Sequence, residues 1–76
     1  MKRIAVYGNK FTEEIVNPVN DLLLRLIKED VEICFYKPFY EYLKNRSKQL
    51  KNIKYFFKEE KDIDDSFDLM ITIGGD

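Results

Sequence analysis

Residues 68–76 have the sequence Asp-Leu-Met-Ile-Thr-Ile-Gly-Gly-Asp. Within it, Leu69–Ile73 is a mainly apolar run without a charge, and Ile4–Tyr7 near the start of the chain is a similar run that ends at Gly8. Unbroken apolar runs, unlike alternating ones, are typical of strands that are covered on both faces, as in a parallel sheet. We therefore expect two buried parallel strands, at Ile4–Tyr7 and Leu69–Ile73.

A helix is predicted after the first strand and a turn at Gly8–Lys10. The apolar residues with helical spacing are Ile15, Val19, Leu22, Leu23, Leu26 and Ile27. Two starts remain open. Thr12 could be the N-cap, with acidic residues following it at the positive end of the helix dipole. Alternatively, Asn17 caps and Pro18 takes the first helical position. In both cases we expect the helix to end near residues 29–30.

The middle of the chain continues the alternation of strands and helices. Val31–Tyr36 is β-rich and partly alternating, which predicts a strand nearer the sheet edge. Pro38 ends it, and a helix is expected from Phe39 to Lys48, followed by a short strand at Ile53–Phe57 and a charged loop at Lys58–Phe67. This order predicts an α/β protein with a three-layer, Rossmann-like parallel sheet.

Composition excludes several classes of function. The 13 basic and 14 acidic residues give a net charge of −1, which argues against a general nucleic-acid binder. The chain has no histidine, so imidazole catalysis and histidine metal sites are excluded within it. No stretch approaches the roughly 20 apolar residues of a membrane span. The single cysteine, Cys34, is expected to be a buried hydrophobe and fits a reducing, cytoplasmic compartment.

Gly74, Gly75 and Asp76 are the candidate functional residues. Ligands of open α/β sheets bind beyond the carboxyl ends of the strands, and these residues follow a strand directly. Two glycines let the backbone approach a ligand and point N–H groups at phosphate oxygens. An aspartate there can take a proton from a hydroxyl or help to hold Mg²⁺. A tight turn in which Asp76 caps a following helix explains the three residues equally well.

Residues 68–76 resemble the strand and loop of the NAD kinases, in which an aspartate and four to five apolar residues precede Gly-Gly-Asp-Gly-Thr. Residues 2–10 are similar to the first strand and turn of the same family. The resemblance implies phosphorylation of the 2′-hydroxyl of the adenosine ribose of NAD by ATP, with a divalent metal such as Mg²⁺. It implies that Asp76 is the proton acceptor, and that Gly74 and Gly75 bring the backbone close to the nucleotides.

The resemblance also carries an expectation about domains and partners. Residues 1–76 would be an incomplete N-terminal α/β nucleotide-binding domain, and the β-rich C-terminal NAD-binding domain would be absent. Such a piece is expected to be inactive alone. The implied partners are small-molecule nucleotides and, at full length, further copies in a dimer or tetramer. No nucleic acid and no membrane is expected as a partner.

Other functions remain possible for the same pattern. Kinases of the diacylglycerol, sphingosine and phosphofructokinase types also have a Gly-Gly-Asp loop. A non-catalytic receiver-like or flavodoxin-like module is the alternative from another class. Gly8–Asn9 lacks the acids that a receiver domain has after its first strand, and only Thr12 is available for a flavodoxin-like phosphate loop.

Three further groups of polar residues favour ordinary surface roles. Lys10 could meet a phosphate but is expected to be a surface lysine. The basic stretch Lys44–Lys61 surrounds aromatic residues 55–57, but its glutamates favour a solvated face over a nucleic-acid site. The acids at 62, 64, 65 and 68 lack the spacing of a Ca²⁺ loop, so we predict a solvated loop in which Asp68 caps the entry to the last strand.

Overall fold

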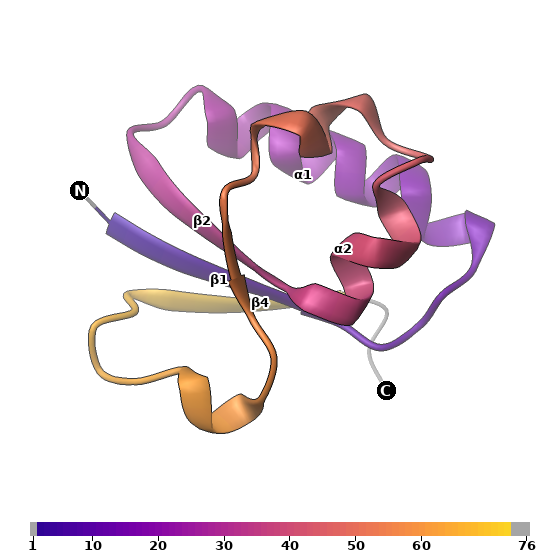
Figure 1. The fold of residues 1–76 in the computed structure, drawn as a ribbon. Coiled ribbons are helices and arrows are strands. Elements are labelled where there is room, and N and C mark those ends of the chain that lie inside the picture. Colours follow the sequence, from indigo (N-terminus) through magenta and orange to yellow (C-terminus); the bar gives the residue numbers. More distant parts are fainter. Residues whose placement is uncertain (1, 74–76) are drawn as a thin grey trace.

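The computed structural model describes residues 2–73 and contains a four-stranded sheet with helical connections (Figure 1). We use α and β for helices and strands and η for 3-10 turns. The elements in chain order are β1 Lys2–Gly8, η1 Glu13–Ile15, α1 Val16–Ile27, β2 Val31–Tyr36, α2 Lys37–Leu43, η2 Lys48–Asn52, β3 Tyr55–Phe57, η3 Glu60–Asp62 and β4 Leu69–Ile73.

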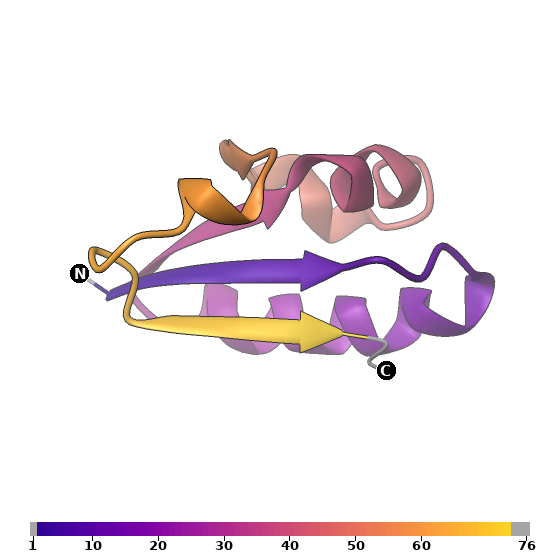
Figure 2. The ribbon, with the colours of Figure 1, turned by 90° about the horizontal axis from the view of Figure 1, so that it is seen from below.

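All strand pairs are parallel, and the strand order is β3-β2-β1-β4. The predicted Rossmann-like parallel α/β fold is therefore confirmed. The chain moves from β1 to β2 to β3 in one direction and then returns to place β4 on the other side of β1. Figure 2 shows β1 and β4 running together, with both arrowheads at the same end of the sheet.

The core consists of two clusters on opposite faces of the sheet, because successive side chains of a strand point to opposite sides. The larger cluster joins the sheet to both helices and includes Ile4, Val6, Val19, Leu23, Ile33, Phe35, Phe39 and Leu43. The smaller one contains Ala5, Cys34 and Phe57, with half-buried Ile63 and Phe67 from the segment before β4 packed against it. Cys34 is 5% exposed, so its predicted role as a buried hydrophobe is confirmed.

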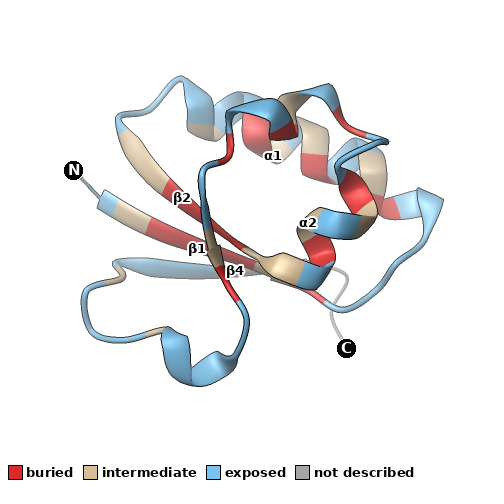
Figure 3. Cartoon of the chain, viewed as in Figure 1, coloured by how far each residue is buried: buried red, intermediate tan, exposed pale blue. Residues whose placement is uncertain are grey.

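Two predictions about strand position are wrong. β2 was expected nearer the edge, but it lies between β1 and β3. β4 was expected to be buried, but within residues 2–73 it is one of the two edge strands, and none of its residues is fully buried (Figure 3). The apolar run of β4 resembles that of β1, but within residues 2–73 β1 has a strand on both sides and β4 pairs with β1 alone.

The first helical segment begins directly after Thr12, as the first of the two predicted starts requires. Thr12 is the N-cap of η1, although its side chain makes no capping hydrogen bond, and α1 continues from Val16. The other start is wrong, because Asn17 and Pro18 lie inside the first turn of α1. The helix ends at Ile27, slightly earlier than predicted, because the chain turns back into β2 through backbone bonds at residues 29 and 31.

The second helix is displaced towards the N-terminus relative to the prediction. α2 begins at Lys37, with Pro38 in its first turn, where the missing N–H costs no helical hydrogen bond. It ends at Leu43, whose carbonyl accepts the N–H groups of Arg46 and Ser47. Ser47 is 3% exposed and its hydroxyl bonds the Asn20 side chain of α1, so the chain turns here instead of continuing as a helix to residue 48.

Among residues 2–73, no helix has the length and apolar character needed to span a membrane.

Candidate functional site at the carboxyl edge of the sheet

The structure places the end of β4 beside the end of β1. In their parallel register, Tyr7 lies opposite Thr72 and Gly8 lies opposite Ile73. The strand order reverses between these two strands, so their carboxyl ends form the topological switch point at which ligands of open α/β sheets bind. The predicted site residues Gly74, Gly75 and Asp76 follow Ile73 directly and lie outside the described residues.

Gly8 is required by close packing at this edge. A Cβ atom at Gly8 would lie 2.4 Å from Cζ and 2.6 Å from two further ring carbons of Phe39. Phe39 is fully buried in the first turns of α2, so its ring has little freedom to move. The absence of a side chain at Gly8 thus lets α2 pack directly against the end of β1.

Aromatic contacts also hold the segment that leaves β1. The ring of Phe11 lies 6.3 Å from that of Phe39 and 5.6 Å from that of Tyr42. Between Gly8 and Phe11, Asn9 and Lys10 are exposed. Lys10 therefore has the predicted surface position, next to the switch point.

The amino ends of the same two strands are joined by a set of contacts around Arg3. The Arg3 N–H donates to Asp68 Oδ2 at 2.8 Å, and the Asp68 N–H donates to the Arg3 carbonyl at 2.8 Å. The guanidinium bonds Glu32 at 2.6 Å and lies 4.3 Å from the centre of the Phe67 ring. Asp68 thus holds the entry to the last strand, as predicted, and fixes the position of β4 along β1.

A cleft of about 390 Å³ opens at the carboxyl ends of the strands, on the sheet face away from α1. Its walls include the register partners Tyr7 and Thr72, and the Tyr7 ring lies 4.6 Å from that of Tyr36. Sequence reasoning missed these residues. The face of each of these side chains follows from the register, because residues opposite each other in neighbouring parallel strands point to the same side of the sheet. The remaining lining residues are Phe57, Lys58, Glu59, Glu60 and Met70.

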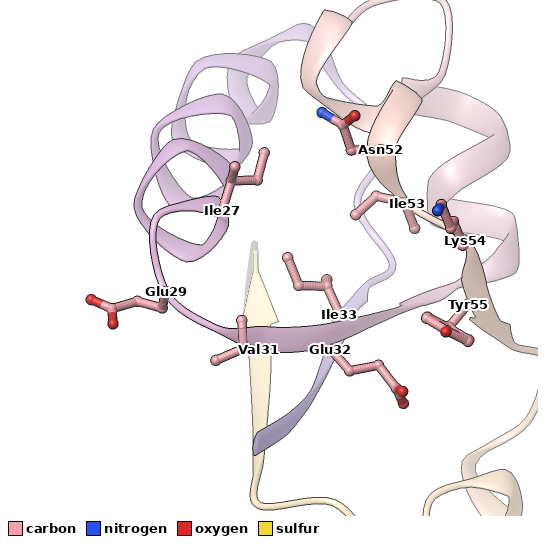
Figure 4. Close-up of a pocket in the computed structure, with 9 residues that line it drawn as sticks. All are labelled: Ile27, Glu29, Val31, Glu32, Ile33, Asn52, Ile53, Lys54 and Tyr55. Carbon is pink, nitrogen blue, oxygen red and sulfur yellow. The ribbon is translucent and has the colours of Figure 1, made fainter. Parts of the chain in front are cut away.

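A second cavity, of about 310 Å³, lies at the opposite end of the sheet. Figure 4 shows its lining side chains around the end of α1 and the amino ends of β2 and β3. Ile27, Ile33 and Ile53 form its apolar part. Its place at the amino ends argues against it as the ligand site, because the switch-point rule concerns the carboxyl ends.

The charged segment before β4 stabilises its own turns. The N–H groups of Lys58 and Glu59 donate to Asp62 Oδ2 and hold the pKa of that carboxyl below its usual range. The hydroxyl and N–H of Ser66 likewise lower the pKa of Asp64. Among residues 2–73, no three acidic or cysteine side chains gather into a possible metal site. The carboxylates of Asp62 and Asp64 are thus occupied by local hydrogen bonds.

The aromatic residues of the basic stretch pack within the protein. Phe57 is buried, and Phe56 is half-buried, with Tyr40 4.6 Å away and Lys37 4.2 Å from its ring centre. Only Tyr55 has an exposed side chain. This arrangement supports the predicted structural role over a surface that stacks bases.

Comparison with known proteins identifies one relative. Over 74 residues the chain is 30% identical to the NAD kinase of Christiangramia forsetii. The matched region covers 97% of this chain and 25% of that protein. The chain thus spans a quarter of the length of this relative. No family model matches the chain, and no solved structure gives a significant match. The predicted resemblance to the NAD kinases is confirmed: over nearly all of its length this chain is similar to one quarter of such an enzyme.

Proposed function

We propose that this chain is part of an NAD kinase, which transfers the γ-phosphoryl group of ATP to the 2′-hydroxyl of the adenosine ribose of NAD. The single observation that carries the proposal is the position of β4, whose end lies at the topological switch point beside Gly8. The similarity to an NAD kinase over 97% of the chain supports the same activity. In this proposal residues 74–76, which follow β4 directly, are the reactive part of the sequence.

In this proposal Asp76 accepts the proton of the 2′-hydroxyl. The ribose oxygen then forms a bond to the γ-phosphorus, the bond from that phosphorus to the bridging oxygen breaks, and ADP leaves. Gly74 and Gly75 bring backbone N–H groups close to the phosphates, since no Cβ obstructs the approach. Phosphoryl transfer depends mainly on such positioning and on electrostatic stabilisation.

Mg²⁺ is the metal that this chemistry implies. Residues 2–73 supply no ready-made set of ligands for it. Mg²⁺ is commonly bound through one or two carboxylates together with substrate phosphates. When bound, the ion would neutralise charge on the phosphates. NAD kinase activity of a complete protein, with the nucleotides as partners, is the function that we propose.

The test is a chimera in which this chain replaces the matching quarter of the Christiangramia forsetii NAD kinase. We expect the purified chimera to form NADP from NAD, ATP and Mg²⁺. Asp76→Asn should lower kcat by about 10²–10⁴-fold, the usual contribution of a general base. Asp65→Asn is the matched control, because this exposed acid lies in the segment before β4.

A folded chimera that binds nucleotides but forms no NADP would contradict the proposed activity. Nearly full turnover of the Asp76→Asn variant would instead remove Asp76 from the role of base. Lipid and sugar acceptors in the same assay distinguish the other kinases with a Gly-Gly-Asp loop.

A further inference from the structure

The ring of Phe39 contacts three segments that meet at the carboxyl edge of the sheet. It stacks on Phe35 of β2, with 5.9 Å between the ring centres, and lies 6.3 Å from the ring of Phe11, which follows β1. Its Cζ end lies against Gly8, the last residue of β1. Because Phe39 is fully buried in a close-packed core, the ring has little room to move. Phe39 thus joins α2 to β2, to the end of β1 and to the segment that leaves β1.

The end of β1 is also the place where β4 ends. Gly8 lies opposite Ile73 in the parallel register, and residues 74–76 follow Ile73 in the chain. Ile73 is half-buried against the core cluster that contains Phe39. The backbone hydrogen bonds of a parallel ladder hold two strands at a fixed separation. A displacement of Gly8 relative to α2 would therefore also displace Ile73.

We propose that Phe39 is a positioning residue for the phosphoryl transfer, a role that rests on the proposed kinase function. It sets how closely α2 approaches the end of β1, and it thereby sets the place from which residues 74–76 leave the sheet. In this role Phe39 acts through the paired strand ends and not on the reacting groups. The contacts that carry the proposal join residues of this chain to one another, so they do not depend on which surfaces a longer protein covers.

The size of the effect follows from the closest distance at this contact. A Cβ atom at residue 8 would lie 2.4 Å from Cζ of Phe39, about 1 Å short of ordinary van der Waals contact. Since the ring is confined, the strand end takes part of the shift. A misplacement of about 1 Å costs about 10²-fold in rate, so Gly8→Ala should lower kcat by about 10- to 100-fold. The KM values should change less, because the methyl group alters alignment and removes no binding group.

Compensation by a smaller side chain at residue 39 is the test. The protein is the chimera described above, in which this chain replaces the matching quarter of the Christiangramia forsetii NAD kinase. Phe39→Leu makes room for the methyl group, so Gly8→Ala with Phe39→Leu should recover most of the kcat that Gly8→Ala loses. Phe39→Leu alone loosens the contact without forcing a shift and should lower kcat by a smaller factor. This single variant keeps the test valid if Gly8→Ala does not fold.

Ile33→Val is the matched control. Ile33 belongs to the same core cluster but lines the cavity at the amino ends of the strands. The substitution should lower the stability of the fold and leave kcat unchanged in enzyme that circular dichroism shows to be folded. A loss of kcat in Ile33→Val as large as that in Phe39→Leu would overturn the proposal, because any loosening of the core would then have the same effect.

Hydrogen exchange separates the positioning role from the kinase activity. In the chimera, the peptide that contains residues 69–76 should exchange faster in Gly8→Ala, and its rate should return towards that of wild type when Phe39→Leu is added. Such a result in a chimera that forms no NADP contradicts the proposed activity but leaves the mechanical link intact. Unchanged exchange, wild-type kcat in folded Gly8→Ala or Phe39→Leu, or a double variant as slow as Gly8→Ala overturns the role of Phe39.

Discussion

β1 and β4 are adjacent parallel strands with similar apolar sequences, yet they differ sharply in burial. Residues 4–6 of β1 are at most 5% exposed, whereas Leu69, the register partner of Ile4, is 53% exposed. β1 has strands on both sides, and β4, in the described part of the chain, pairs with β1 alone. An apolar run thus makes a strand suitable for burial, but the neighbouring strands decide whether it is buried.

The largest expected effect is a difference in the free energy of unfolding between matched substitutions in β1 and β4. Ile4→Ala removes buried contacts and leaves a cavity, so it should lower the free energy of unfolding by about 2–5 kcal/mol. Leu69→Ala should change it by no more than about 0.5 kcal/mol, because the side chain is largely solvated. Urea denaturation measures both, and Ile4→Val, at about 0.5–1.5 kcal/mol, serves if Ile4→Ala does not fold. Equal losses at the two positions would refute the difference in burial.

An intermediate effect is expected where β1 ends. Gly8→Ala forces a methyl group against the Phe39 ring and should cost about 1–3 kcal/mol of stability through overpacking. Asn9→Ala, at the next and exposed position, is the control and should be nearly neutral. Phe39→Leu combined with Gly8→Ala tests the cause in a double-mutant cycle. If the two changes are additive, the Phe39 ring is not what excludes a side chain at Gly8.

The smallest effect concerns the link between the two strands. Asp68→Ala removes the acceptor of the Arg3 N–H and should lower stability by about 0.5–1.5 kcal/mol. Asp68→Asn keeps an acceptor oxygen and should lose less. Hydrogen exchange at the Arg3 amide is the direct measurement, since this amide should exchange faster in the alanine variant. Unchanged exchange would show that the carboxylate does not protect it.

Local patterns in the sequence predicted the parts of the fold that depend on neighbouring residues. The bounds of β2 and β4 agree with the prediction, because Val31–Tyr36 and Leu69–Ile73 end at strong local signals. Helix α2 was placed too far along the chain, because the tertiary bond between Ser47 and Asn20 is invisible in local spacing. The neighbours of each strand were equally invisible, so the edge position of β4 and the inner position of β2 were missed.

Some parts of the candidate site were likewise predicted from local sequence, and others were not. The sequence predicted that an apolar strand leads into residues 74–76, and β4 ends at the switch point. It did not predict that Tyr7, Tyr36 and Thr72 line one cleft, because they come from three strands whose order depends on the whole topology. The roles of residues 74–76 remain predictions.

The contact between Arg3 and Asp68 fixes the position at which β4 begins to pair with β1. β4 extends five residues from this contact, or about 16 Å at the usual rise of a strand. A slip by one residue would move its far end by about 3.3 Å and turn every side chain to the other face. Reacting groups lose about 10²-fold in rate for a 1 Å misplacement. The proposed catalysis therefore depends on the length of β4, although the contact between Arg3 and Asp68 lies at the opposite end of the strand from residues 74–76.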